Sequence, residues 1–364
     1  MKTPLKEHII FSLPGKKITV PIYIGKDSFD NIKSVVSLNK YSSILIITDE
    51  NVAHHWTDKI HRTIGEGAYY LTIPAGEKNK SLSNVEKIWT ILSKKGFDRK
   101  SLIINIGGGM VCDIGAFAAS TFMRGISFIQ VPTSLLAMAD ASIGGKTGFN
   151  FNGLKNTIGT FSVPLAVLSD TSFLSSLPPR EFRSGFAEII KHAIIVNTNF
   201  WDYLLSMNLI SPKENELDKI LSLSSNIKCE IVRNDPYEKN ERKKLNFGHT
   251  IGHAVEMSCH DSSKPLLHGE AVAIGIIAES RMSFLSGYLS EAKFRDIENL
   301  IVKFKLPNKI SSSHKEGMLT KIKFDKKNSS QKIKWVFLED IGNVKVDVTL
   351  PDDIVLEGLN YILE

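Results

Sequence analysis

Side chains with metal-ligating chemistry recur in the second half of this 364-residue sequence. The segment NFGHTIGHAVE places His249 and His253 four residues apart, so both would project from one face of a helix. His268 opens the later helical pattern LHGEAVAIG, and Glu188 lies within the helical pattern EFRSGFAEIIKHAII. Two or three imidazoles and one carboxylate suit a divalent metal ion with one position left open for substrate. The alternative is that these histidines are core or helix-capping residues.

The spacing of His249 and His253 also occurs in metalloproteases, where a glutamate base follows the first histidine. Thr250 occupies that position here, which disfavours protease chemistry. Residue types and spacing leave open which subset of the four groups binds the metal ion.

A glycine-rich turn in the first half has the character of an anion site. Gly107, Gly108 and Gly109 follow the apolar run SLIINI and precede a helical pattern. Glycines there let backbone amides approach a pyrophosphate, whose charge a helix N-terminus favours. Asp49 follows an earlier apolar run and could accept a hydrogen bond from a ribose hydroxyl. The spacing is not GxGxxG, so a glycine turn without a ligand is the alternative.

Basic side chains occur in small or apolar surroundings, as in ASIGGKTG and GLKNTIG. This placement favours a pocket for phosphate or carboxylate groups, and solvated surface lysines are the alternative. The residues concerned are Arg124, Lys146, Lys155, Lys191, Lys228 and Arg242.

The predicted secondary structure that positions these groups changes along the chain, from alternating strands and helices to mainly helices. Apolar runs at 42–51, 101–109, 126–134 and 165–170 predict buried strands, and patterns such as 84–96 predict helices between them. This alternation predicts a parallel sheet with helices on its faces. After Leu177 almost every segment has helical periodicity, and Pro178-Pro179 marks a natural boundary.

The predicted fold is therefore α/β: a Rossmann-like, nucleotide-binding parallel-sheet domain over 1–176, followed by a mainly α-helical metal- and substrate-binding domain over 177–364. The cleft between the two domains is the expected site.

Composition excludes several classes of protein. The chain is 42% hydrophobic and 23% charged, and its three cysteines form no CxxC pair, which favours reduced thiols over disulfides or a thiolate zinc site. No apolar run is long enough to span a membrane, and the N-terminus has no signal-peptide pattern. The net charge of +6 suits an anionic small molecule, and the basic region 321–334 has no nucleic-acid signature. We expect a cytoplasmic protein without membrane or nucleic-acid partners.

Eight segments, in this order, resemble the 3-dehydroquinate synthase family, and they span most of the chain. They are GEKNKS (76–81), GGGMVCDIGAFAASTFMRG (107–125), QVPTSLLAMADASIGGKTGFN (130–150), LKNTIG (154–159), LPPREFRSGFAEIIKHAII (177–195), ERKKLNFGHTIGHAVE (241–256), LHGEAVAIG (267–275) and DKKN (325–328).

The resemblance implies roles for individual residues. Zn²⁺ or Co²⁺ would be held by Glu188, His249 and His268, while His253 would face the substrate. NAD would contact Asp49, Glu77, Lys80, Gly108, Gly109, Asp113, Thr133, Ser134, Lys146 and Lys155. Substrate contacts would fall on Asp140, Lys146, Lys155, Asn156, Lys191, Lys228, Arg242 and Asn246. Arg124, reaching across a homodimer interface, and either Lys326 or Lys327 would complete a phosphate pocket.

The implied reaction belongs to the shikimate pathway of aromatic amino acid biosynthesis. It converts 3-deoxy-D-arabino-heptulosonate 7-phosphate to 3-dehydroquinate and phosphate by transient oxidation with NAD, phosphate elimination, reduction and intramolecular aldol closure. His253 and Asn246 are candidates for a proton relay around the phosphate. Three positions depart from the usual family pattern: Cys112 replaces a glycine, Leu154 replaces a glycine, and Ser162 replaces a glutamine.

Three other functions fit parts of this pattern. A related sugar phosphate cyclase, such as a 2-deoxy-scyllo-inosose synthase, would share the NAD and metal residues but vary those facing the substrate. A metal-dependent polyol dehydrogenase would need no phosphate pocket. A non-catalytic anion- or nucleic-acid-binding protein would leave Glu188 and the histidines unexplained, and its binding would be sensitive to salt.

Overall fold

The computed structural model describes residues 5–13, 16–196, 198–207, 214–259, 262, 264–328 and 333–364. These residues group into two compact units. Unit 1 takes in positions 1–178 and 213–236, and unit 2 takes in positions 179–212 and 237–364. In the part of the chain that is described, no helix is both long enough and apolar enough to cross a membrane.

The described residues of unit 1 form a seven-stranded sheet with the strand order β1-β2-β9-β6-β5-β3-β4. Its strands are β1 (Leu5–Leu13), β2 (Lys16–Ile24), β3 (Ile44–Asp49), β4 (Tyr69–Ile73), β5 (Leu102–Gly107), β6 (Ser127–Pro132) and β9 (Val167–Ser169). β1 and β2 pair antiparallel, and all other neighbours pair parallel. Every residue of β5 is buried, as expected for a parallel strand covered on both faces. The predicted Rossmann-like parallel sheet is confirmed.

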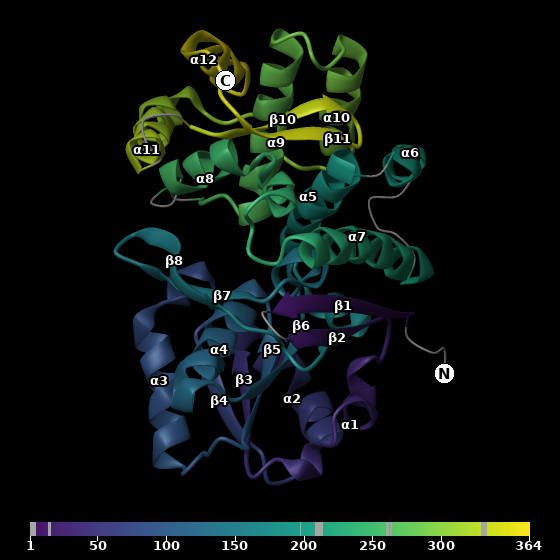
Figure 1. The fold of residues 1–364 in the computed structure, drawn as a ribbon, viewed down its shortest axis with the longest axis vertical. Helices are drawn as coiled ribbons and strands as arrows, with labels where there is room; N and C mark the ends of the chain where they lie inside the picture. Colours follow the sequence, from purple (N-terminus) through teal and green to yellow (C-terminus); the bar gives the residue numbers. More distant parts are fainter. Residues whose placement is uncertain are drawn as a thin grey trace. The chain divides into compact units, whose positions relative to one another are not determined.

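Helices lie on both sides of this sheet, with α3 and α4 on one side and α1 and α2 on the other (Figure 1). They are α1 (Ile32–Val35), α2 (Glu50–Ile64), α3 (Leu82–Lys94) and α4 (Gly109–Thr121). α4 packs closely on β5 because glycines leave room: a Cβ at Gly115 would lie 1.9 Å from Asn105 Oδ1, and one at Gly107 would lie 2.5 Å from Val111 Cγ2. This packing sets the position of the α4 N-terminus.

Shorter elements connect the sheet and extend it. The antiparallel hairpin of β7 (Lys146–Phe151) and β8 (Leu154–Phe161) follows the π-helical turn η5 (Ala137–Ala141). The 3₁₀ helices of unit 1 are η1 (Phe29–Asn31), η2 (Leu38–Lys40), η3 (Glu77–Asn79), η4 (Phe122–Arg124) and η6 (Thr171–Ser176).

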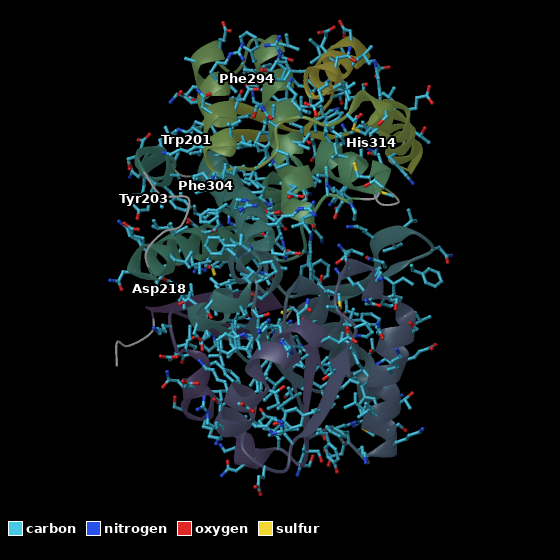
Figure 2. The ribbon with its side chains drawn as sticks, turned by 180° about the vertical axis from the view of Figure 1, so that it is seen from behind. Trp201, Tyr203, Asp218, Phe294, Phe304 and His314 are labelled. Atoms are coloured by element: carbon cyan, nitrogen blue, oxygen red, sulfur yellow. The ribbon has the colours of Figure 1, made fainter. Side chains whose placement is uncertain are left out.

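The long helix α7 (Glu214–Asn234) also belongs to unit 1, although it follows the first helices of unit 2 in sequence. Ser222 and Asn226 on α7 donate hydrogen bonds to Glu7 Oε1 on β1, at 3.0 and 2.9 Å. Asp218, marked in Figure 2, accepts a hydrogen bond of 2.9 Å from Thr171 Oγ1. These contacts attach α7 to the sheet.

Unit 2 is mainly helical, as predicted. Its helices are α5 (Pro179–Val196), α6 (Thr198–Ser206), α8 (His249–Ser258), α9 (His268–Leu285), α10 (Glu291–Lys303), α11 (Lys315–Asn328) and α12 (Asp352–Tyr361). The 3₁₀ helices η7 (Glu241–Asn246) and η8 (Ser312–His314) and the hairpin of β10 (Trp335–Asp340) and β11 (Asn343–Val348) complete it. Trp201, Phe294 and Phe304, labelled in Figure 2, are buried in its core.

α9 is the central helix of unit 2 and is buried along most of its length. α8 packs against α9 so closely that their backbones are in contact at glycines. A Cβ at Gly275 would lie 2.0 Å from Gly248 O, and one at Gly252 would lie 3.1 Å from Val272 Cα. Because no side chain fits between the two helices at these glycines, the register of α8 on α9 is closely fixed.

Candidate active site

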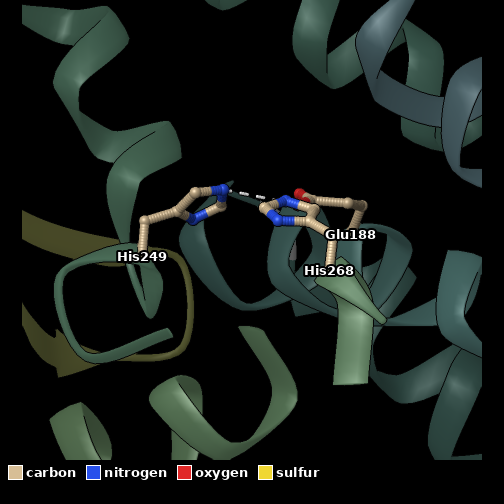
Figure 3. A group of neighbouring side chains, drawn as sticks. All are labelled: Glu188, His249 and His268. Carbon is tan, nitrogen blue, oxygen red and sulfur yellow. Dashed lines mark ion pairs between the residues drawn. The ribbon is translucent and has the colours of Figure 1, made fainter. Parts of the chain in front are cut away.

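Three helices of unit 2 bring Glu188, His249 and His268 together (Figure 3). Glu188 lies in α5, while His249 and His268 are the first residues of α8 and α9. Both imidazole Nε2 atoms lie 3.4 Å from Glu188 Oε1. One donor atom from each residue falls within 4.8 Å of the other two. The structure therefore brings together the three residues that the family resemblance implies as metal ligands.

Both imidazole rings are oriented through their Nδ1 atoms. His249 Nδ1 lies 3.3 Å from the carbonyl oxygen of Phe247, and His268 Nδ1 lies 3.2 Å from Glu256 Oε2. If each Nδ1 carries the proton and donates it, each Nε2 is left with a lone pair directed at the shared position. This is the arrangement that metal-binding imidazoles require.

The electrostatics of this cluster favour an ionised carboxylate. Burial alone would raise the pKa of Glu188, but the ammonium of Lys191 and the ring of His249 outweigh it and hold that pKa well below its usual range. Lys191 forms a buried ion pair with Glu188. Burial and Lys191 lower the pKa of His249, and the Glu188 carboxylate opposes part of that shift.

The pKa of His268 shifts in the opposite direction, upward. Burial opposes its protonation, but hydrogen bonds to Glu188 and Glu256 outweigh burial and raise the pKa of His268 to about 9. A cation bound at Nε2 would take the place of that proton.

The donor set fits a divalent ion. One carboxylate and two imidazoles with an open position are typical of catalytic zinc sites. Glu188 Oε1 faces both imidazole Nε2 atoms at 3.4 Å, so the three side chains turn donor atoms toward one position. His253 is not part of this donor group, although its ring centroid lies 5.3 Å from that of His249.

The other predicted substrate residues of unit 2 lie on α5 and η7. Lys191 is buried beside Glu188, and Arg242 is buried in η7. Asn246, the last residue of η7, donates a 2.7 Å hydrogen bond to Glu238 Oε1. Glu238 has a left-handed backbone with φ of 58°, and no sequence pattern singled it out.

In unit 1, the predicted pyrophosphate site is the N-terminus of α4. Gly108 is the N-cap, where no side chain caps the helix, and Gly109 begins the first turn. A Cβ at Gly109 would lie 3.2 Å from Ala141 Cβ, so the turn is closely surrounded. The Thr133 amide donates to Gly107 O at 3.0 Å, and Ser134 Oγ accepts from the Ala137 amide at 3.3 Å. An uncapped helix start built on glycines fits a pyrophosphate.

Asp49 lies at the end of β3, the neighbour of β5 in the sheet. Its Oδ1 accepts hydrogen bonds of 3.0 Å from the amides of both Asn51 and Val52, so it caps α2. Burial raises the pKa of this carboxyl despite these hydrogen bonds. The second oxygen is not used by the cap, which is compatible with the predicted ribose contact.

Lys80 joins several predicted NAD and substrate residues. Its ammonium forms an ion pair with Asp113 and donates to Asn156 Oδ1. Burial raises the pKa of Asp113, and Lys80 counteracts part of that effect. Nearby on the hairpin, Asn150 Nδ2 donates to Glu77 Oε1 at 2.9 Å, and its Oδ1 accepts from the Asn156 amide at 3.0 Å.

Lys228 on α7 forms an ion pair of 2.6 Å with Asp140 Oδ1 and donates to the carbonyl oxygen of Asp140 at 2.7 Å. Both residues belong to unit 1. The pair ties α7 to η5, so it positions two predicted substrate residues together.

The remaining predicted residues lie at the edges of unit 1 or outside the described side chains. Lys146 begins β7 and is exposed, and Lys155 is half-buried in β8. Arg124 is exposed, with a left-handed φ of 71°. The side chains of Lys326 and Lys327 lie outside the described residues.

The positions that depart from the family pattern are accommodated locally. Cys112 is buried in α4, with Sγ 3.7 Å from Gly107 O, and burial raises the pKa of its thiol. Leu154 follows Gly153 in the turn of the β7–β8 hairpin, where Gly153 has φ of 75°. Ser162 donates its amide to Gly145 O at 2.8 Å.

Glu256 is the clearest residue that the sequence analysis missed. It contacts His268 from a different helix, so only the folded structure reveals the contact. The one available signal was its position seven residues after His249, which puts both on the same face of α8.

Comparison with known proteins relates the chain to one family. The model for the 3-dehydroquinate synthase N-terminal region matches residues 70–184, and the model for the C-terminal region matches residues 185–328. A 3-dehydroquinate synthase of Alkaliphilus metalliredigens (strain QYMF) is 41% identical over 345 residues, which cover 94% of this chain and 96% of that protein.

Solved structures share the fold. A 2-deoxy-scyllo-inosose synthase solved with carbaglucose-6-phosphate, NAD⁺ and Co²⁺ has a TM-score of 0.86 and 23% identity, covering 98% of this chain and 99% of that one. The 2-epi-5-epi-valiolone synthase ValA of Streptomyces hygroscopicus subsp. jinggangensis 5008, solved with NAD⁺ and Zn²⁺, has a TM-score of 0.85 and 24% identity, covering 97% and 98%.

Proposed function

Since the chain belongs to the 3-dehydroquinate synthase family, we propose that it converts 3-deoxy-D-arabino-heptulosonate 7-phosphate to 3-dehydroquinate and phosphate, with NAD and a divalent metal ion as cofactors. The observation that carries this proposal is 41% identity to a 3-dehydroquinate synthase over nearly the full length of both chains. The cluster of Glu188, His249 and His268 supports the metal requirement.

A divalent ion held by Glu188, His249 and His268 would supply Lewis acidity toward a substrate hydroxyl, and NAD bound at the start of α4 would supply a reversible hydride acceptor. Buried Lys191 keeps Glu188 ionised and therefore ready to bind a cation. Buried Arg242 would bind an anionic group of the substrate, because a guanidinium without water around it strongly favours a carboxylate or phosphate.

His253 is proposed to move a proton at the phosphate. It lies one helical turn after His249, outside the group of ligand atoms, so it can exchange protons without leaving a metal ion. Asn246 would orient the same region, and its hydrogen bond to Glu238 fixes the direction of its amide.

The test is phosphate release from 3-deoxy-D-arabino-heptulosonate 7-phosphate by the purified protein, with and without NAD, and before and after chelation. We expect one phosphate and one dehydroquinate per substrate, and loss of both products when either cofactor is removed. Absence of release by metallated, NAD-loaded protein would contradict the proposal. Turnover of another heptulose or hexose phosphate would then assign the chain to a different cyclase reaction.

We further propose a cytoplasmic homodimer in which Arg124 serves the partner's site. Arg124 is exposed, so its side chain is accessible to a second copy of the chain. Mixing inactive Arg124→Ala protein with inactive Lys191→Ala protein should restore part of the activity, because one site of each mixed dimer would be intact. No recovery, with mixed dimers detected by mass spectrometry, would exclude a role in trans.

A further inference from the structure

The two imidazoles of the cluster differ in what orients them. His249 directs Nδ1 at a neutral backbone carbonyl, that of Phe247. His268 instead directs Nδ1 at the carboxylate of Glu256, with Nδ1 to Oε2 at 3.2 Å. Because a carboxylate is a stronger acceptor than a carbonyl, it fixes the ring and its tautomer more firmly.

Glu256 is well placed to act on His268. Its side chain is only 9% exposed, so water screens its interaction with the ring weakly. It lies on α8, the helix that begins with His249, and the glycine contacts at Gly252 and Gly275 fix the register of α8 on α9. The same helix therefore carries one ligand and orients the other.

Glu256 is not itself part of the ligand group. The group formed by Glu188, His249 and His268 takes one donor atom from each of these three side chains, and Glu256 is not a member of it. Its oxygen contacts the Nδ1 side of the ring, opposite the Nε2 that faces Glu188.

We propose that Glu256 is a positioning residue for metal binding: its carboxylate holds the His268 ring in the orientation that presents Nε2 to the metal ion. The inference rests on the proposed metal site but not on the identity of the sugar phosphate. Carboxylate partners of this kind typically raise metal affinity by about 10–100-fold.

The test compares three variants loaded with Co²⁺ in the absence of substrate. Glu256→Ala removes the acceptor, Glu256→Gln keeps an acceptor but removes its charge, and Glu298→Gln removes a carboxylate that pairs with Tyr361 and Arg295 elsewhere in unit 2. Co²⁺ affinity is measured by competition with a chelator, and coordination by the visible absorption of the bound ion.

We expect Glu256→Ala to bind Co²⁺ about 10–100-fold more weakly with an altered absorption spectrum. Glu256→Gln should retain part of the affinity, and Glu298→Gln should match the unsubstituted protein. Unchanged affinity and spectrum in Glu256→Ala would overturn the role of Glu256 while leaving the metal site intact. If Glu256→Ala does not fold, an unchanged affinity and spectrum in Glu256→Gln would overturn the role. Failure of the unsubstituted protein to bind Co²⁺ would overturn the metal site and this inference together.

Discussion

At the scale of single residues, the proposed metal ligands are distinct from the histidine proposed to transfer a proton. Glu188, His249 and His268 converge, while His253 lies beside them without joining the group of ligand atoms. His249 and His253 therefore have different environments, although their spacing in the sequence alone made both candidate metal ligands.

Replacement of His253 by alanine should leave the metal content unchanged and slow phosphate release by about 10²–10⁴-fold, the usual contribution of a general acid or base. Metal content is measured by atomic emission, and phosphate release in a single turnover. His249→Ala is the matched control on the same helix and should lose the metal. Loss of metal from His253→Ala as well would show that His253 is a ligand.

At the scale of elements, Glu279 of α9 caps α8. The N-cap residue of α8 is Gly248, which has no side chain to offer, and φ of 78°. Glu279 Oε2 accepts from the Gly248 amide at 2.7 Å, and Oε1 accepts from the Ile251 amide at 3.2 Å. Replacement by alanine would leave these buried amides unsatisfied and should destabilise folding by about 1–3 kcal/mol, measured by chemical denaturation. Glu279→Gln retains a hydrogen-bond acceptor, so its free energy of unfolding should fall by less than that of Glu279→Ala.

The same residue gives a dependence on pH. Burial raises the pKa of Glu279 from 4.5 to about 8. Between these values the folded protein holds a proton that the unfolded chain has released, so the free energy of unfolding falls as pH rises. Glu279→Gln should remove this contribution, so its stability should decline less from about pH 5 to about pH 8. If the free energy of unfolding changed with pH equally in Glu279→Gln and in the unsubstituted protein, the prediction would be contradicted.

In unit 1, Asp170 links several elements. It is fully buried, pairs with Lys59 of α2 at 2.9 Å, and accepts from the amides of Asp27 and Ser172 at 2.9 Å each. Lys59→Met would leave the Asp170 carboxylate without its cation, so we expect a loss of about 3–5 kcal/mol in unfolding free energy. Lys33→Met, a lysine substitution on α1, is the control and should have a small effect. A change below 1 kcal/mol for Lys59→Met would mean that hydrogen bonds alone satisfy Asp170.

At the scale of the whole molecule, the proposed cofactors should stabilise different parts of the chain. All proposed NAD contacts belong to unit 1 and all proposed metal ligands to unit 2. In hydrogen exchange followed by mass spectrometry, Zn²⁺ should protect the amides of α5 and the first turns of α8 and α9. NAD should protect the first turn of α4 and the segment around Lys80. Protection by Zn²⁺ centred on α4 would contradict the assignment.

The sequence was most informative where burial is complete. β3, β5, β6 and β9 are mostly buried, and their apolar runs identified them. β4 was not predicted, because the exposed Tyr69 and Tyr70 interrupt its apolar pattern at the sheet edge. The hairpins β1–β2 and β7–β8 were also not predicted. Their pairing depends on contacts that periodicity does not encode.

The candidate site was predictable in its residue types but not in its supporting contacts. Glu188, His249 and His268 stand in recognisable segments, and the structure brings them together. Their function as ligands and the roles of the other predicted residues stay predictions. Glu256 and Glu279 act across the α8–α9 contact, which three glycines create, so their partners depend on tertiary packing.

The placement of α7 affects how the protein folds during synthesis and where the chain can be cut into separate units. A ribosome releases the strands of unit 1 first, but the helix that binds Glu7 and Asp140 follows only after α5 and α6 of unit 2. Unit 1 therefore cannot finish folding during synthesis until a part of unit 2 has already emerged. For the same reason, a gene cut after Pro178 would encode an incomplete half, and either unit expressed alone would need its two segments rejoined by a new linker.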